Sequence, residues 1–181
     1  MWFVIFDILL IFVPAIIYLY EERSKGTNTQ RLIKAFKRLG LKGMQAKELV
    51  IKSAILLLVV LLLSIILFLI FSFFGIDDTA QVDERVRTLG IALVAYVLVV
   101  RVPAEEIFFR GFLVKKVGIV PASLIFGLAH YGYGSVAEII GAFMLGLVFS
   151  YAYKRNNNLL PNIIAHSLYN LLFFITLFGF G

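Results

Sequence analysis

The feature that most constrains this chain is a run of apolar residues long enough to cross a lipid bilayer. Residues 53–74 carry no charge and consist mainly of Leu, Ile, Val and Phe. A helix needs about 20 such residues to span the hydrocarbon core. Several other apolar runs follow, and 61% of the 181 residues are apolar whereas only 15% are charged. The sequence therefore predicts an all-α, polytopic integral membrane helical bundle.

Six membrane spans fit the apolar pattern, and we expect a single membrane domain over residues 1–181. Residues 1–75 would supply the N-terminal spans and a basic loop at 21–51, and residues 89–178 would form a catalytic helical core. The N-terminus lacks the basic region and cleavage site of a signal peptide, so we expect the first span to be retained. The spans are expected at about residues 2–20, 52–74, 89–116, 119–130, 136–153 and 159–178.

The loop charges provide an independent test of this number of spans. Residues 21–52 hold nine Lys or Arg and three Glu, and two further basic pairs lie at 115–116 and 154–155. The loop at 76–88 holds four acids and only two arginines. With six spans, every basic cluster falls on one side of the membrane. The positive-inside rule then predicts a multi-pass cell-membrane protein with loop 21–51 in the cytoplasm and both termini outside.

The remaining composition narrows the classes of partner and chemistry. The net charge of +6 is explained by cytoplasmic loops and anionic headgroups, so we expect contact with membrane lipid and no nucleic-acid partner. The chain has no cysteine, which excludes disulfides and cysteine nucleophiles. Within the basic loop, residues 31–41 have apolar residues at helical spacing. They predict an amphipathic helix on the inner membrane surface, with a solvated linker helix as the alternative.

The third span contains charged residues that are costly inside a membrane. A charge at mid-bilayer costs about 2.5–3.5 kcal/mol on insertion scales, so such residues are paired, hydrated or functional. Glu106 and Arg110 are four residues apart and can pair on one face of the helix. Glu105 points elsewhere and would be left as a base. Arg101 is also four residues from Glu105, in the less favourable order, so a pair between these two residues is the alternative. Pro103 predicts a kink between these groups.

Two other spans carry the only histidines of the chain. His130 ends the fourth span, and His166 and Asn170 share a face of the sixth. At about 1.5 Å per residue, Glu105 and these three residues all lie about 10–17 Å from the basic ends of their spans. A common level on three helices indicates a site rather than separate core histidines.

Two further acids lie outside this pattern. Asp7 in the first span and Glu138 in the fifth have no comparable partner in the sequence. We expect them to be near-interface groups that face water or the bundle.

A carboxylate, two histidines and an amide form a hydrolytic set. Glu105 would take a proton from a water molecule held between it and His130, and that water would attack a peptide carbonyl. His166 and Asn170 would donate hydrogen bonds to the oxyanion. The sequence has no His-Glu-x-x-His metalloprotease motif. The predicted catalytic residues are Glu105, Glu106, Arg110, His130, His166 and Asn170.

These motifs, in this order and spacing, resemble the CPBP family of CAAX proteases and bacteriocin-processing enzymes, which includes the type II CAAX prenyl endopeptidases. They are Glu105-Glu106-x-x-x-Arg110, Phe126-x-x-x-His130 and His166-x-x-x-Asn170. The resemblance implies an intramembrane endopeptidase of the glutamate type, with a peptide or protein substrate that in the prenyl proteases is a lipidated C-terminal CaaX sequence. Many members are called metalloproteases. We expect no cofactor here, and a zinc ion held by Glu105, His130 and His166 is the alternative.

Three readings compete with proteolysis. A non-enzymatic membrane scaffold or immunity protein would keep the motifs for packing. A b-type haem protein would use the two histidines as axial ligands. An ion or proton transporter would use the intramembrane carboxylates.

Overall fold

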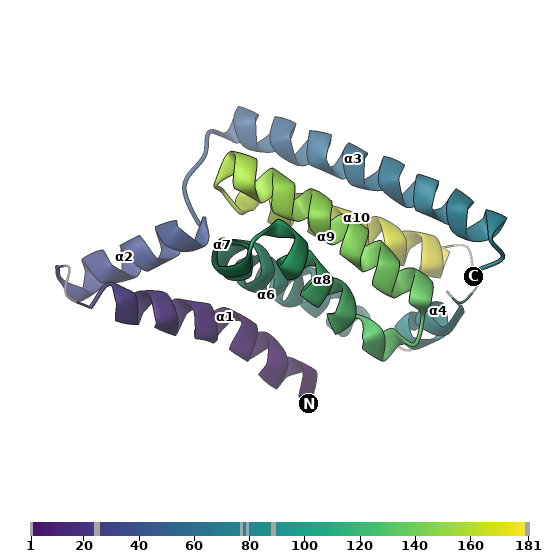
Figure 1. Ribbon diagram of the computed structural model, residues 1–181, viewed down its shortest axis with the longest axis horizontal. Coiled ribbons are helices and arrows are strands. Elements are labelled where there is room, and N and C mark those ends of the chain that lie inside the picture. The colour runs from purple at the N-terminus through teal and green to yellow at the C-terminus, as the bar shows by residue number, and fades with distance from the viewer. Residues whose placement is uncertain (1, 24–25, 77, 79, 88–89, 180–181) are drawn as a thin grey trace.

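The protein is an all-helical bundle, as the sequence predicts. The computed structural model describes residues 2–23, 26–76, 78, 80–87 and 90–179, and it has no strand within them. The long helices run along the longest dimension of the molecule (Figure 1). The elements are α1 (Trp2–Glu21), α2 (Asn28–Leu39), α3 (Ala46–Phe73), α4 (Ala80–Arg87), α5 (Ile91–Tyr96), η1 (Val97–Arg101), α6 (Val102–Glu105), η2 (Glu106–Leu113), α7 (Val114–Val117), α8 (Ile119–Ala129), η3 (Tyr131–Tyr133), α9 (Val136–Asn156) and α10 (Leu160–Gly179).

Each of the six predicted spans is helical in the structure. The protein is a multi-pass membrane protein. Among the described residues, four helices are long and apolar enough to cross a membrane, namely α1, α3, α9 and α10. The third span is a continuous series of short helical segments from α5 to α7, and its predicted start at Leu89 lies outside the described residues. Helix α8 has 11 residues, about 16 Å, which is too short to cross alone.

The third span departs from α-helical geometry on both sides of Pro103. The π-helical segment η1 precedes α6, and a second π-helical segment, η2, follows it. Proline cannot donate to the helical hydrogen-bond ladder, so an irregularity at this position is expected. π-Helical turns widen the backbone locally and are frequent at functional sites. Glu105 ends α6 and Glu106 begins η2, so both acids lie at this irregularity.

The two ends of the bundle differ in charge. We call the end that carries α2, Lys115, Lys116, Lys154 and Arg155 the basic end, and the end that carries Asp78 and α4 the acidic end. Figure 1 shows α2 at one end of the molecule, and α4 with the end of α10 towards the other. Of the predicted acidic loop, Asp77 lies outside the described residues, and the side chain of Asp83 is not described.

A short helix, α4, occupies part of the segment that was expected to be a loop. Its Val82 is buried against Phe174 and Leu177 of α10. This contact explains why an eight-residue, mostly polar segment becomes helical: one apolar side chain anchors it to the bundle. Helix α4 therefore packs against α10 at the acidic end.

The basic end is closed by a packed apolar cluster. Helix α2 begins with a capping box at Thr27 and ends at Gly40 in the left-handed conformation. Its Ala35 and Leu39 are buried in the bundle, so the solvated-linker alternative is wrong. Leu32 and Phe36 of the same helix remain exposed, as an amphipathic helix at a membrane surface requires. The cluster comprises Tyr18, Ala35, Leu39, Ile107, Val114, Ala122, Tyr153 and Leu159.

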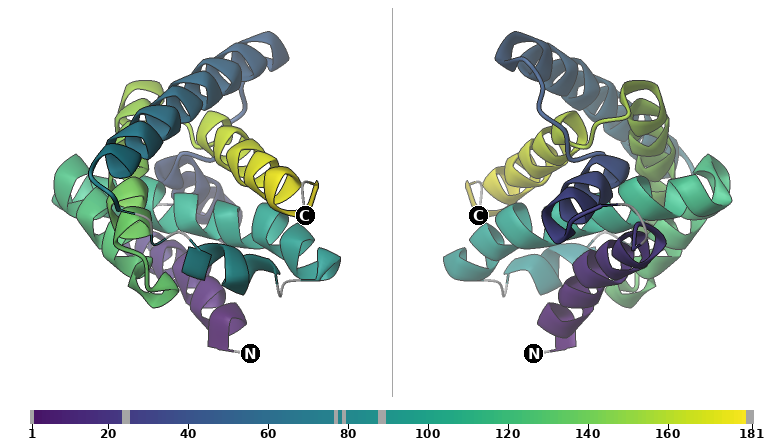
Figure 2. Two further views of the ribbon diagram at one scale, coloured as in Figure 1. Left: turned by 90° about the vertical axis from the view of Figure 1, so that its right-hand side faces the viewer. Right: turned by 90° about the vertical axis from the view of Figure 1, so that its left-hand side faces the viewer.

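Glycines permit the closest helix contacts. A Cβ atom on Gly111 would lie 2.5 Å from the carbonyl oxygen of Leu39, so only glycine lets the end of α2 sit on the third span. A Cβ atom on Gly127 of α8 would lie 2.9 Å from the carbonyl oxygen of Ile139 in α9. These contacts, like the small-residue interfaces of other membrane helices, bring backbones together by removing side-chain bulk. Figure 2 shows α1 and α3 on opposite sides of the helices that they enclose.

Candidate active site

A cavity of about 280 Å³ lies between α3, the third span, α8, α9 and α10. Its wall is largely apolar, and four predicted site residues contribute polar groups to it. They come from three spans that are far apart in the sequence. These residues are Glu105, His130, His166 and Asn170.

The other two predicted residues, Glu106 and Arg110, lie behind the cavity wall. Both are completely buried, and their closest charged atoms are 3.0 Å apart. The guanidinium group also lies over the ring of Phe126 at 4.1 Å and faces that of Phe149 at 5.3 Å. Its nitrogens make no hydrogen bond of good geometry to the described residues. The predicted Glu106–Arg110 pair is therefore confirmed. The attraction between the two charges and the contacts of the guanidinium group with the aromatic rings stabilise it.

Glu106 also orients two side chains of α10. His166 Nδ1 lies 2.9 Å from its Oε1, and the Asn162 amide donates to its Oε2 at 3.1 Å. Asn162 donates as well to the carbonyl oxygen of Phe149, at 2.8 Å. His166 was expected to donate to the oxyanion together with Asn170, and its contact with Glu106 was not predicted. Asn162 was missed, although its position four residues before His166 places both on one face of the helix.

Glu105 is not left unpaired. Arg101 Nε lies 3.0 Å from Glu105 Oε1, so the alternative pair with Arg101 is confirmed and the expectation of a Glu105 without a partner is wrong. The preceding turn of the helix supplies the cation, which is the less favourable order for an exposed pair. In a membrane interior the charge of Glu105 must be compensated, and Arg101 is the nearest available cation.

Asp7 of α1 lies in the same group of charged residues as Arg101 and Glu105. It is buried, and Tyr96 donates a hydrogen bond to its Oδ2 at 2.9 Å. Its charge interacts with Arg101 and Glu105. Asp7 therefore faces the bundle, but the expectation that it has no partner is wrong. The sequence signal is an isolated acid in a span, which indicates a buried partner on another helix.

His130 presents one ring nitrogen to the cavity side. Its Nδ1 lies 2.8 Å from the carbonyl oxygen of Phe126, an acceptor, so Nδ1 carries the proton in the neutral ring. Nε2 then keeps a lone pair that can accept a proton or bind a metal. The ring packs on the edge of Phe126 and stacks with Tyr133.

Glu138 lines the same cavity, which the sequence did not predict. Its charge interacts with His130 and with Glu105. It lies in the first turn of α9, where Ser135 caps the helix by accepting a hydrogen bond from its backbone N–H. A carboxylate in the first turn of a helix is favoured by the helix dipole. The helix dipole thus offsets the cost of a charge at the end of a span. Because the start of the helix already explains an acid at this position, the sequence gave no separate signal that Glu138 belongs to a site.

Asp78 fixes the loop that leads into α9. Its carboxylate accepts hydrogen bonds from the Ser135 hydroxyl at 2.7 Å and from the backbone N–H groups of Val136 and Ala137. Partial burial raises its pKa, but these hydrogen bonds outweigh that effect and hold the pKa below its ordinary value. Asp78 thus stabilises the start of the helix that carries Glu138.

A metal site was the alternative to metal-free chemistry. Over the described part of the chain, no three His, Asp or Glu side chains come together in a group that could hold a metal ion. Of the three candidate ligands, Glu105 is paired with Arg101 and His166 with Glu106. Arg101 compensates the charge of Glu105, whereas His166 meets Glu106 through Nδ1 and keeps Nε2 for another partner.

Comparison with known proteins bears on the identity of this region. A model of the family described as type II CAAX prenyl endopeptidase Rce1-like matches residues 87–172. That part of the chain, a little under half of it, is similar in sequence to the Rce1-like family. The matched Rce1-like segment contains all six predicted catalytic residues.

A curated relative extends this comparison. UPF0177 protein YxdF of Lactococcus lactis subsp. lactis (strain IL1403) is 30% identical over 89 residues, which cover 46% of this chain and 49% of the relative. The alignment thus spans about half the length of that protein. No solved structure matches the chain significantly.

Proposed function

We propose that this protein is an intramembrane endopeptidase that hydrolyses peptide bonds with an activated water molecule. The observation that carries the proposal is the convergence of Glu105, His130, His166 and Asn170 on one cavity inside a membrane bundle. The Rce1-like match over the same residues supports a protease of the CAAX type. In this function the catalytic residues are those named above, with no resident cofactor.

The first step is the attack of water on the peptide carbonyl. Glu105 takes a proton from the water, while the free Nε2 of His130 accepts a hydrogen bond from it. The ion pair with Arg101 fixes the base beside the cavity. The water oxygen then forms a bond to the carbonyl carbon, and the carbonyl π electrons move to its oxygen.

The second step is collapse of the tetrahedral intermediate. The Asn170 amide donates a hydrogen bond to the oxyanion, and His166, whose Nδ1–H is held by Glu106, donates a second one from Nε2 when its ring carries both protons. The C–N bond then breaks, and the leaving nitrogen takes the proton from Glu105. Because Glu106 is balanced by Arg110, its role is to orient His166 rather than to act as a base.

The substrate proposed for the first test is a farnesylated C-terminal CaaX peptide. Purified wild type in detergent is expected to cleave it, and mass spectrometry of the products reports the cut bond. Glu105→Ala should abolish cleavage, and a strong chelator should not. Loss with chelator and restoration by zinc would make the enzyme metal-dependent. No cleavage by wild type would remove this substrate and favour the non-enzymatic alternative.

A further inference from the structure

Arg101 interacts with two acids that come from different helices. Its Nε lies 3.0 Å from Oε1 of Glu105, one turn later in the third span. Its charge also interacts with that of Asp7, which α1 supplies. One cation is therefore shared by two carboxylates, and we call these three residues the Asp7–Arg101–Glu105 group. Asp7 lies outside residues 87–172, which the Rce1-like family model matches.

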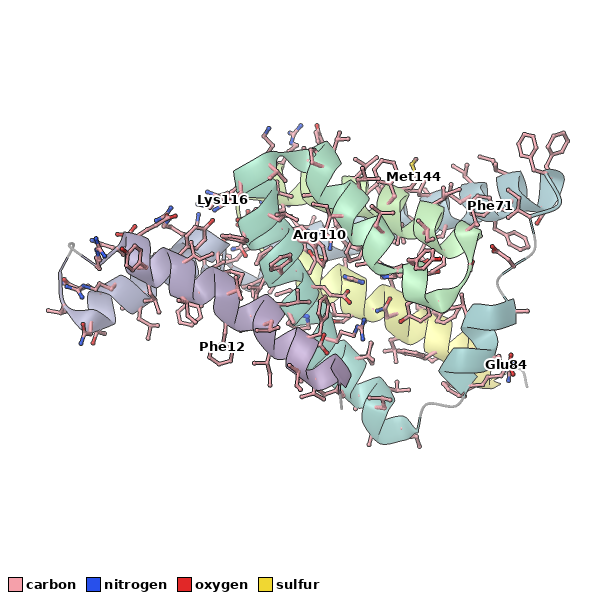
Figure 3. The ribbon with its side chains drawn as sticks, turned by 60° about the horizontal axis from the view of Figure 1, so that its bottom comes forward. Phe12, Phe71, Glu84, Arg110, Lys116 and Met144 are labelled. Carbon is pink, nitrogen blue, oxygen red and sulfur yellow. The ribbon has the colours of Figure 1, made fainter. Side chains whose placement is uncertain are left out.

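The inner face of α1 brings Asp7 to the third span. The buried residues Asp7, Leu10, Pro14 and Tyr18 recur every three or four positions, so they lie on one face of the helix. Helix α1 packs against α6 and η2 of the third span. Figure 3 shows Phe12 on the other side of α1, pointing away from the bundle. Asp7 is thus part of the contact between α1 and the third span.

The contacts of Asp7 indicate a carboxylate that needs a cation. Asp7 is 1% exposed, and Tyr96 donates a hydrogen bond to its Oδ2 at 2.9 Å. Its Oδ1 is also buried and makes no hydrogen bond to any residue that the structure describes. A hydrogen bond to one oxygen leaves most of the charge of a buried carboxylate uncompensated, and Arg101 is the cation with which Asp7 interacts. An ionisable residue inside a membrane points to function by default.

The third span contains two Glu–Arg pairs that differ in their surroundings. Glu106 and Arg110 are completely buried and balance each other. Glu105 and Arg101 would balance in the same way, but Asp7 adds a second negative charge to this pair. When Glu105 takes a proton from water, the Asp7–Arg101–Glu105 group passes from a net negative charge to neutrality. Without Asp7 the pair would pass from neutrality to a net positive charge, which a low-dielectric interior disfavours.

We propose that Asp7 is a positioning residue of the candidate active site, because it shares Arg101 with Glu105 and leaves Glu105 the negative charge that draws a proton from water. This effect on cleavage rests on the proposed function, in which Glu105 is the base. The contact of Asp7 with Arg101 does not rest on it. Arg110 and Glu138 also interact with Glu105 by charge, and both stay unchanged in every variant of the test.

Two variants separate the charge of Asp7 from its hydrogen bond. Asp7→Asn keeps the shape of the side chain and an acceptor for Tyr96, but it removes the charge. Tyr96→Phe keeps the charge and removes the hydrogen bond. For each protein in detergent, kcat and KM are measured with the farnesylated CaaX peptide, and the melting temperature is measured on the same preparation.

The expected result is a kcat about tenfold lower in Asp7→Asn with an unchanged KM, which is a part of the about 10²–10⁴-fold that a general base contributes. Tyr96→Phe should keep a kcat close to that of wild type, although its melting temperature falls. An equal fall of kcat in the two variants would assign the effect to structure and overturn the proposal. A wild-type kcat in Asp7→Asn would also overturn it.

The contact between Asp7 and Arg101 is tested without cleavage. Melting temperatures are measured for Asp7→Asn, Arg101→Gln and the double variant. Each single variant leaves a charge inside the membrane without its counter-charge, so the double variant should lose clearly less than the sum of the two single losses. Additive losses would overturn the contact, and with it the proposal. If wild type cleaves no peptide even in detergent, the proposed function fails for this substrate, and the melting temperatures alone decide whether Asp7 holds Arg101.

Discussion

The basic and acidic halves of this bundle are built from the same helices, yet they serve different purposes. In the basic half, aromatic and aliphatic side chains fill the interior around Tyr18 and Tyr153. In the acidic half, the same helices enclose a cavity with charged and amide groups in its wall. The comparison indicates that packing in one half holds the bundle together while the other stays hollow for chemistry. The Glu106–Arg110 pair lies where the halves meet.

The largest effect is expected where both halves depend on one residue. Glu106→Ala leaves the fully buried Arg110 without its counter-charge and removes the partners of His166 and Asn162. Breaking a buried pair in this way costs about 3–5 kcal/mol. We expect a large drop in the melting temperature in detergent and loss of cleavage. Glu138→Gln, on the cavity wall, is the control, and an equal drop in that variant would remove the distinction between the halves.

A change confined to the acidic half, which contains the cavity, should lower activity without lowering stability. Glu105→Gln keeps the shape of the side chain and a hydrogen-bond partner for Arg101 but cannot accept the proton from water. Cleavage should fall by about 10²–10⁴-fold. The melting temperature should stay within a few degrees of that of wild type. Retained cleavage would show that another group, with Glu138 the nearest candidate, is the base.

A change confined to the packed basic half should instead lower stability. Gly111→Ala places a methyl group 2.5 Å from the carbonyl oxygen of Leu39 and pushes α2 away from the third span. Such overpacking costs about 1–3 kcal/mol, measurable as a lower midpoint of thermal unfolding. Gly141→Ala in α9 meets nothing within 4 Å and serves as the matched control. If both variants melt at the same temperature, α2 does not seal the basic end as described.

The smallest effect is expected at the cap of α9. The pKa of Asp78 is lowered in the folded state, so its contribution is complete above its ordinary pKa and is lost as the pH falls through the lowered value. Asp78→Asn should cost about 1 kcal/mol at neutral pH, the usual size of a lost cap. The difference from wild type should shrink as the pH falls below about 4. A difference that stays constant over this range would contradict the charged cap.

Periodicity and composition predicted much of this architecture, and the reasons are local. Apolar length defined the spans, and the four-residue spacing of Glu106 and Arg110 predicted their pair. Contacts between helices distant in sequence were not accessible in the same way. The Asp7–Tyr96 bond and the packing of Val82 join segments whose separation in sequence carries no periodic signal.

The candidate site was likewise predicted only in those features that depend on spacing along one helix. The level of Glu105, His130 and His166 could be counted along each helix, because rise per residue is fixed. The rise per residue does not show which partner each acid takes. Arg101 and Arg110 are both four residues from an acid, and the rotation of the third span decides that one pair faces the cavity and the other the interior.

The most direct test of the account is the cleavage rate of Asn170→Ala, measured beside its melting temperature on one preparation. Asn170 lines the cavity, and its amide is assigned to the oxyanion. The account predicts a loss of about 10²–10³-fold in cleavage of the farnesylated CaaX peptide with an unchanged melting temperature. Cleavage at the wild-type rate in this variant would contradict a proteolytic site in the hollow half.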